Sequence, residues 1–436
     1  MFLQNAIEKR IDDDNPVKVA LIGAGKFGSM FLSQVPSTKG IEVLVIADLK
    51  PDNAIKACKN VGWSDDLINK TKFVDTGADA IKLNEVEVVI EATGFPAAGI
   101  EHARQAFQNG KHIIMVNVEA DVLAGAALAK EANSVGVVYS MAYGDQPALT
   151  AEIVEWARAS GFNVTSAGKG TRYQPIYHKS SPDTVWDYYG LTHEEARKAG
   201  MNPKMFNSFL DGTKSGLEMA AIANACDLEV PTNGLLFPPC GMDDLANILK
   251  PLEFGGLLEK NGQVEVVSSL ERDGRPVFKD LRWGVYAVLE APNDYAASCF
   301  KQYGMNTDDT GKYSAMYKPF HLIGMELNIS VFSAALLNQA TGQTKKFTGD
   351  VVSTTKKNLK KSEILDGEGG ATVWGKLVPS KLSLSMEALP IGLAHGIKLK
   401  NEIEENKIIT WNDVDFSSND PAISYRRKME KDFKKS

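Results

Sequence analysis

Short apolar runs alternate with longer amphipathic stretches between residues 17 and 141. The apolar runs are rich in β-branched residues and have the length of single strands, whereas the amphipathic stretches have the length of helices. This alternation is typical of βαβ units and predicts an α/β fold with a doubly wound parallel sheet, a Rossmann domain. The predicted strands cover residues 17–22, 43–46, 86–92, 111–116 and 136–140.

Beyond residue 140 the pattern changes. Helical patterns at residues 147–160 and 215–226 are mixed with extended segments at 264–269 and 283–289, which predicts an α+β substrate domain. A stretch rich in Lys, Thr and Gly at residues 339–349 is interpreted as a linker. Short strand-like pieces between residues 392 and 416 then predict a small β-rich domain. We therefore expect three domains, at residues 1–145, 146–340 and 345–436.

Composition narrows the class of protein without changing this outline. Of the 436 residues, 44% are hydrophobic and 24% are charged, which is typical of a globular protein. The net charge is −7 and the cations are scattered, so we expect no nucleic-acid partner. The one cluster of cations, at residues 426–435, is predicted to form a solvent-exposed helix with charges of both signs.

Cysteine usage and the N-terminal sequence favour a cytoplasmic protein. The cysteines, at positions 58, 226, 240 and 299, are widely spaced and form no C-x-x-C pair or zinc pattern, so we expect reduced thiols and no metal. The first 14 residues are mainly polar and lack the apolar core of a signal peptide. No apolar run reaches the ~18–20 residues of a transmembrane helix, so we expect no membrane partner.

A glycine-rich motif follows the first predicted strand directly. Gly23, Gly25 and Gly28 form the pattern G-x-G-x-x-G and precede a helical segment, as a dinucleotide-binding motif requires. Gly23 would permit a tight turn, Gly25 a close approach of backbone amides to a pyrophosphate, and Gly28 close packing of helix on strand. Lys26 and Phe27 lie in the same loop and are predicted to bind the cofactor with them. The alternative is a βα turn with a purely structural role.

The second predicted strand ends in Asp48, which lies 20 residues after Gly28. A carboxylate at this spacing can accept hydrogen bonds from both hydroxyls of the adenosine ribose. Its charge opposes a 2′-phosphate, so we expect NAD or NADP with NAD favoured. Lys50 follows closely and would weaken that preference. Alternatively, Asp48 only caps the next turn.

Polar residues also stand at the ends of the next two predicted strands. Thr93 and Gly94 follow one strand, and Asn117 and Glu119 follow the other. Because ligands bind at the carboxyl ends of strands in an open α/β sheet, we expect these residues near the nicotinamide. Alternatively, Glu119 and Asp121 only begin the next helix, where acidic side chains are favourable.

In the predicted substrate domain, Lys169 stands between two glycines just after a predicted strand at residues 163–167, and Arg172 follows. Two cations beside a bare backbone predict a site for an anionic substrate, although a flexible surface loop has the same composition. Asp145, before a predicted helix, is a candidate either to cap that helix or to contact the substrate.

The segment from Asp211 to Glu218 is the second candidate for chemistry in this domain. If helical, it places Asp211, Lys214 and Glu218 on one face, because residues three, four and seven apart share a face. A lysine flanked by carboxylates can exchange a proton with a carbonyl oxygen that is being reduced. The alternative is a solvated face of ion pairs. His321 is a further candidate to bind substrate, although lone histidines are more often structural.

These motifs together resemble the homoserine-dehydrogenase-like oxidoreductases that carry a C-terminal SAF domain. The resemblance implies that residues after about 345 form the SAF-like module, and that the protein is a homodimer or larger homo-oligomer. It implies hydride transfer between a nicotinamide and a small polar hydroxy or keto substrate, homoserine-like or sugar-phosphate-like. The motifs that carry it are the three loop glycines, Asn117-Val-Glu119-Ala-Asp121, Ser166-Ala-Gly168-Lys169-Gly170 and Asp211-Gly-Thr-Lys214.

One branch of this group is the reductoisomerase-like enzymes of isoprenoid precursor synthesis. Similarity to that branch implies conversion of deoxyxylulose phosphate to methylerythritol phosphate with NADPH and a divalent metal. In either reaction we expect Lys214 and Lys169 to orient or protonate the substrate oxygen, with Asp211, Glu218 and Glu119 positioning them. A third hypothesis is a non-catalytic regulator that binds the cofactor and uses the SAF-like module as its contact surface.

Overall fold

The computed structural model describes residues 3–434, which divide into two compact units. The first unit runs to Glu152 and also includes His321–Lys345. The second unit consists of Ile153–Phe320 and the chain from Lys346 onward. Residues 321–345, assigned from sequence mainly to the second domain, join the first unit because their helix packs on its sheet. The three-domain division itself stays a prediction.

The first unit is built on a six-stranded parallel sheet with the order β3-β2-β1-β4-β5-β6. The chain adds strands toward one edge from β1 to β3 and then toward the other edge from β4 to β6, while all strands run parallel. This strand order is that of a doubly wound dinucleotide-binding sheet. All five predicted strands are present; β3 was not predicted because it has three residues and none is buried. The strands are β1 (Val17–Ile22), β2 (Ile41–Ala47), β3 (Lys72–Val74), β4 (Val88–Glu91), β5 (His112–Met115) and β6 (Tyr139–Met141).

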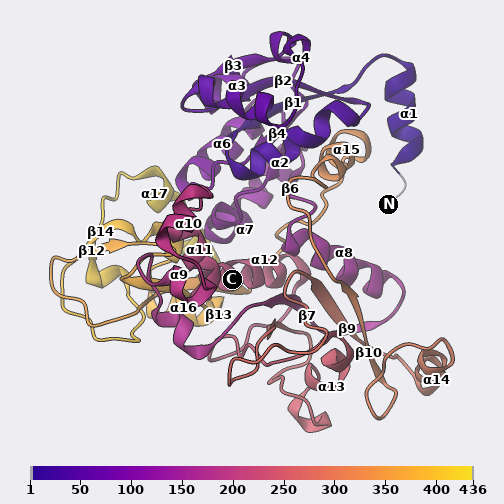
Figure 1. Ribbon diagram of the computed structural model, residues 1–436, viewed down its shortest axis with the longest axis vertical. Coiled ribbons are helices and arrows are strands. Elements are labelled where there is room, and N and C mark those ends of the chain that lie inside the picture. Colours follow the sequence, from indigo (N-terminus) through magenta and orange to yellow (C-terminus); the bar gives the residue numbers. More distant parts are fainter. Residues whose placement is uncertain (1–2, 435–436) are drawn as a thin grey trace. The chain divides into compact units, whose positions relative to one another are not determined.

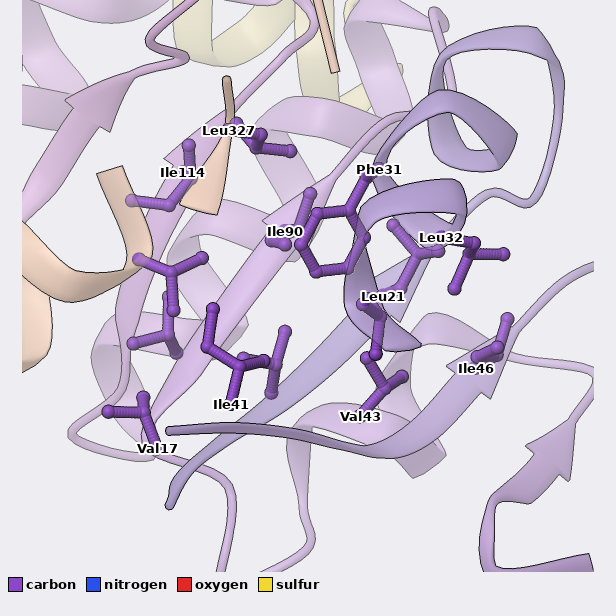
Figure 2. Close-up of a cluster of buried hydrophobic side chains, with 14 of the residues drawn as sticks. Val17, Leu21, Phe31, Leu32, Ile41, Val43, Ile46, Ile90, Ile114 and Leu327 are labelled. Atoms are coloured by element: carbon purple, nitrogen blue, oxygen red, sulfur yellow. The ribbon is translucent and has the colours of Figure 1, made fainter. Parts of the chain in front are cut away.

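Helices cover this sheet, and the core lies between them and the strands. Figure 2 shows Leu21 and Ile90 of the central strands packed around Phe31, with Leu327 joining them from a distant part of the chain. That residue precedes α15 (Asn328–Leu337), which contacts β1, β4, β5 and β6 and is the orange helix near β4 and β6 in Figure 1. The other helices are α1 (Gln4–Asp12), α2 (Lys26–Gln34), α3 (Pro51–Asn60), α4 (Asp65–Lys70), α5 (Gly77–Ile81), α6 (Pro96–Gln108) and α7 (Val118–Val135).

The second unit contains a four-stranded mixed sheet with the order β10-β9-β7-β8. Strand β7 (Asn163–Thr171) pairs parallel with β8 (Gln263–Ser268) and antiparallel with β9 (Val285–Glu290), and β10 (Tyr313–Lys318) forms an edge. The mixture of strands and helices confirms the predicted α+β character. The helices of this part are α9 (Val185–Tyr189), α10 (His193–Lys198), α11 (Pro203–Leu210), α12 (Thr213–Cys226), α13 (Leu245–Ile248) and α14 (Asp294–Gln302); α8 (Gln146–Ala159) begins in the first unit.

Helix α12 is the central helix of the second unit. It contacts β7 and β8 and, on another face, two strands of the C-terminal region, β11 (Gly349–Thr355) and β13 (Val373–Pro379). All of its residues except Lys214 are buried. A helix enclosed in this way needs small apolar residues all round, which explains its run of alanines.

The C-terminal region is rich in short strands, as predicted. Two form an antiparallel pair and three form a separate small sheet. The strands are β11 (Gly349–Thr355), β12 (Ile364–Asp366), β13 (Val373–Pro379), β14 (His395–Leu399) and β15 (Val414–Asp415), accompanied by α16 (Ser380–Met386) and α17 (Pro421–Lys434).

The prediction of a solvent-exposed C-terminal helix with charges of both signs is wrong for its inner face. Arg426 of α17 is fully buried, and its guanidinium bonds Asp350 Oδ2 at 2.5 Å and Glu430 Oε1 at 2.9 Å. Two carboxylates neutralise the cation, which allows the burial that a composition-based argument did not foresee. The last residue of the predicted cluster, Lys435, lies outside the described residues.

Two further sequence expectations concern the whole chain. Within residues 3–434, none of the helices has the length and apolar character needed to span a bilayer. All four cysteines are described, and each is a free thiol.

Candidate functional site

The glycine-rich loop of the first unit joins β1 to α2 and has the geometry that dinucleotide binding requires. Gly23 has a φ of +95°, which an L side chain rarely adopts, and a Cβ there would press on the Ala92 carbonyl at 2.8 Å. At Gly28 a side chain would collide with the Gly23 carbonyl oxygen. At Gly25, the residue that precedes α2, a Cβ would meet no atom within 4 Å. The loop therefore needs glycine at two positions for its own fold, whereas Gly25 faces open space where a pyrophosphate could approach.

Asp48 lies at the carboxyl end of β2 and faces this loop. Its Oδ2 accepts a hydrogen bond from the Ala24 amide at 3.1 Å, and its Oδ1 accepts one from the Lys50 amide at 3.1 Å. The side chain is partly exposed, so each carboxylate oxygen keeps capacity to accept from a ribose hydroxyl. Asp48 thus both orders the loop and presents a negative charge beside it; Lys26 is exposed and Phe27 partly buried at the start of α2.

A buried carboxylate at the end of β4 was missed from the sequence. Glu91 is fully buried; its Oε1 accepts from the Thr93 hydroxyl at 2.5 Å and lies 3.2 Å from His102 Nδ1. Its Oε2 has no hydrogen-bond partner among the described residues. The signal available was the same as for Asp48, a carboxylate ending an apolar strand. Glu91 fixes Thr93, while Gly94 has a φ of +71° and is exposed.

Asn117 and Asp121 at the start of α7 have structural partners. Asn117 is buried: its side chain caps α7 through the Ala120 amide and donates to the Phe95 carbonyl at 2.9 Å. Asp121 accepts from the hydroxyls of Tyr139 and Thr344, and its burial raises the pKa of the carboxyl to about 6. Glu119 is partly exposed in the same first turn. Asn117, expected from sequence near the nicotinamide, thus caps the helix, whereas Asp121, one of the two acidic residues considered for helix initiation, is a core carboxyl.

In the second unit, the structure brings Lys169 together with Glu218. Lys169 extends from β7 and Glu218 from α12, and their ammonium and carboxylate groups form a direct ion pair. Their side chains are only 7% and 5% exposed. Lys169 is therefore part of a strand, since β7 continues to Thr171, and the interpretation of a flexible surface loop is wrong.

The glycines on either side of Lys169 have a packing role. A Cβ at Gly168 would collide with the Glu265 carbonyl oxygen, and one at Gly170 with the Leu281 carbonyl oxygen. Gly168 thus permits the close pairing of β7 with β8, and Gly170 the close approach of the backbone at Leu281, while Lys169 projects from the opposite face of the strand. The space beside these two glycines, expected from sequence to admit an anionic ligand, is thus occupied by backbone of the protein itself.

The predicted helical face of Asp211, Lys214 and Glu218 is not formed. Asp211 ends α11, and α12 begins only at Thr213, after Gly212 with a φ of +92°. The Asp211 carboxylate is fully buried and bonds Lys356 Nζ at 2.7 Å and the Thr213 amide at 2.9 Å. Asp211 therefore ties the start of α12 to the C-terminal region, and Glu218 pairs with Lys169 instead.

The remaining candidates lie as follows. Lys214 is partly exposed on the first turn of α12. Arg172, at the end of β7, donates to the Tyr188 carbonyl at 3.1 Å, while its Nε is buried without a partner among the described residues. Asp145 is buried and accepts from the amide of the next residue, Gln146, at 2.8 Å. His321 is partly exposed at the start of the segment that returns to the first unit.

Comparison with known proteins defines the class of protein. Residues 23–142 match the family model for the NAD-binding domain of homoserine dehydrogenase. Residues 144–327 match the model for the catalytic domain of oxidoreductase DRL. None of the curated proteins matches the sequence significantly. The chain is therefore an NAD(P)-binding oxidoreductase, similar to oxidoreductase DRL and to homoserine dehydrogenase in adjoining parts.

Solved structures with a similar fold include a homoserine dehydrogenase from Thiobacillus denitrificans, with 14% identity over 78% of this chain and 83% of that one, and a TM-score of 0.43. A myo-inositol dehydrogenase from Lactobacillus casei, solved with NAD(H), has 15% identity over 39% and 50% of the two chains, and a TM-score of 0.30. The 3-ketoreductase KijD10 from Actinomadura kijaniata, solved with NADP, has 16% identity over 37% and 50%, and a TM-score of 0.26. The matched part spans about half of each of the last two proteins, and no inference about substrate is drawn from any of the three.

Proposed function

We propose that the protein transfers hydride between NAD(H) and a hydroxyl or carbonyl carbon of a small polar substrate, with Lys169 at the reacting oxygen. The observation that carries this proposal is the buried ion pair of Lys169 and Glu218 within the region that matches an oxidoreductase catalytic domain. A buried ion pair contributes little net stability compared with apolar residues of the same volume. Other buried pairs, such as Lys356 with Asp211, join elements of the fold. We assign the chemical role to Lys169 because it also stands in the motif Ser166–Gly170 that carries the family resemblance.

The residues of the first unit fit a dinucleotide. The open space at Gly25, the left-handed turn at Gly23 and the carboxylate of Asp48 are the features that would hold its pyrophosphate and adenosine ribose. A bound nicotinamide supplies or accepts the hydride. Because Asp48 places a negative charge where a 2′-phosphate would lie, we propose NAD as the preferred cofactor.

Lys169 has the chemistry that the substrate oxygen requires. Its ammonium can donate a hydrogen bond to a carbonyl oxygen, stabilise the charge that develops there and deliver a proton to it. In the oxidative direction the same nitrogen receives the proton. Glu218 is a positioning residue in this scheme, because its carboxylate holds the ammonium in place.

The substrate proposal is a small hydroxy or keto compound other than homoserine. Only the cofactor domain matches a homoserine dehydrogenase model, whereas the catalytic region matches the DRL model. The second candidate is the sugar-phosphate reductoisomerase reaction, to which the motifs are similar. That reaction implies a divalent metal. Residues 3–434 contain no group of three His, Cys, Asp or Glu side chains arranged to hold one, so we propose no metal ligands.

The test is a screen of hydroxy acids, homoserine and sugar phosphates, including deoxyxylulose phosphate, with NAD(H) and NADP(H), followed by the nicotinamide absorbance. With an active substrate, Lys169→Met should lower kcat by about 10²–10⁴-fold, the usual range for a general acid or base. Its NADH affinity should stay within about threefold of wild type, because Lys169 lies outside the Rossmann unit.

Two further variants separate chemistry from folding and from the other candidate lysine. Lys169→Arg keeps the positive charge opposite Glu218 but holds its proton too strongly to act as an acid, so it should fold and still lose activity. Lys214→Met removes the other lysine candidate. Full activity of Lys169→Arg, or loss confined to Lys214→Met, would show that Lys169 is structural. Tight NADH binding without turnover of any compound would favour the regulatory hypothesis.

A further inference from the structure

The second unit encloses a cavity of about 220 Å³ that none of the residues discussed so far accounts for. It lies where the start of α12, the loop at residues 233–237 and strand β13 meet. It therefore joins the region that matches the catalytic-domain model to the C-terminal region. The lining residues used below are His178, Gly212, Gly216, Phe237, Trp374 and Lys376.

Aromatic rings form two walls of this cavity, and other rings hold them in place. Phe237 stacks on Tyr173 with ring centroids 4.0 Å apart, and the Trp374 ring lies 4.1 Å from that of His178. The Tyr173 hydroxyl lies 2.9 Å from His178 Nε2, and His178 Nδ1 donates to the Asp211 carbonyl at 2.7 Å. A carbonyl only accepts, so Nδ1 carries a proton. Burial lowers the pKa of the His178 imidazole below its usual value, which favours the neutral ring. The walls are thus rigid, flat and without charge.

Among the lining residues that the structure describes, Lys376 is the only one with a charged side chain. Among residues 3–434, its ammonium has no ion-pair or hydrogen-bond partner. Gly234 makes room for its stem, because a Cβ there would stand 3.1 Å from Lys376 Cε. The helix dipole of α12, which has 14 residues and begins beside Gly212, adds positive potential at the same end. In the described part of the chain, none of the lining residues carries a carboxylate that would offset this charge.

The cavity is separate from the Lys169–Glu218 pair. Gly212 and Gly216 line it, and these residues share a face of α12 because they are four apart. Glu218 follows Gly216 by two residues, which turns its side chain by about 200° around the helix axis. Helix α12 therefore lies between the ion pair and the cavity.

We propose that this cavity binds a small planar carboxylate. Its volume corresponds to about seven water molecules at the ~30 Å³ that each occupies in the liquid, which limits the ligand to a small molecule. The carboxylate would pair with the Lys376 ammonium, and the flat apolar part would lie against Phe237 and Trp374. This site goes beyond the proposed oxidoreductase function and does not depend on it.

Isothermal titration calorimetry with benzoate, a planar carboxylate of this size, tests the proposal on the full-length chain. We expect saturable binding of one benzoate per chain, and at least tenfold weaker binding of benzylamine, which has the same ring and the opposite charge. Lys376→Met should weaken benzoate binding at least tenfold, whereas Lys376→Arg should restore it to within about threefold.

The matched control is Lys381→Met, which removes an exposed lysine from α16 without touching the cavity and should leave the affinity unchanged. Circular dichroism and melting of each variant establish that it is folded. Absence of saturable benzoate binding at millimolar concentration would overturn the proposal. Equal affinity for benzylamine, or undiminished binding by folded Lys376→Met, would overturn it as well.

Discussion

At the scale of single residues, two aspartates of the Rossmann unit show that the environment of a carboxylate decides whether it is available to a ligand or belongs to the core. Asp48 is partly exposed and bonds two backbone amides with capacity left for a ligand. Asp121 is buried and accepts from two hydroxyls. Both were singled out from sequence as carboxylates near strand ends, and only their environments distinguish them.

Asp48→Ser tests the first environment. Wild type should bind NADH more tightly than NADPH, because the carboxylate accepts from a free 2′-hydroxyl and repels a phosphate. The variant should narrow that gap, as measured by dissociation constants at fixed ionic strength. Asp52→Ser, which removes an equal charge from an exposed position on α3, should leave the ratio unchanged. A tenfold preference of wild type for NADPH would contradict the assignment.

Asp121→Asn tests the second environment through the pH dependence of stability. Burial raises the pKa of this carboxyl in the folded protein to about 6, from an ordinary value of 3.8. A raised pKa means that the stabilising contribution is present below pH ~4 and is lost as the pH rises through ~6, at a cost of about 3 kcal/mol. The amide cannot ionise, so the melting temperature of the variant relative to wild type should rise between pH 4 and 7. A pH-independent difference would refute the raised pKa.

At the scale of secondary-structure elements, local patterns predicted much of the fold. Apolar runs located five strands of the parallel sheet, because a fully buried strand needs a continuous apolar segment. Strand β3 escaped because it is short and not buried. The break between α11 and α12 was not predicted either. Gly212 indicates it, since glycine readily adopts the positive φ that ends a helix.

The contacts that build the candidate site were beyond such local patterns. The Lys169–Glu218 pair joins residues 49 positions apart, and Asp211–Lys356 joins residues 145 apart. Nothing near Lys356 in the sequence distinguishes it from an exposed lysine. Ion pairs between distant elements depend on tertiary packing, so Lys169 and Glu218 could be nominated from sequence but could not be paired.

In the loop between β1 and α2, a side chain at Gly25 should affect cofactor binding, whereas one at Gly28 should affect stability. Gly25→Val should fold normally, because a Cβ there meets open space, yet it should lose NADH binding by filling the approach of the pyrophosphate. Gly28→Val should lower the melting temperature, because its side chain collides with the Gly23 carbonyl. Melting curves and NADH titrations of both variants make the comparison. Normal NADH binding by Gly25→Val would rule out the assigned cofactor position.

At the scale of the whole molecule, the two units carry different parts of the proposed reaction. The first has the parallel sheet, the glycine-rich loop and Asp48, and matches an NAD-binding domain. The second has the buried lysine and matches an oxidoreductase catalytic domain. In its C-terminal region, Lys356 bonds Asp211 and so connects the region to the rest of the unit. The buried Arg426 of α17 bonds Asp350 of β11 and so holds the last helix on this region.

The account depends above all on nicotinamide binding by the first unit. Titration of the folded, full-length chain with NADH, followed by nicotinamide fluorescence, measures this directly. We predict saturable binding of one NADH per chain that NAD displaces. A folded chain that binds neither NADH nor NADPH saturably at millimolar concentration would contradict the account.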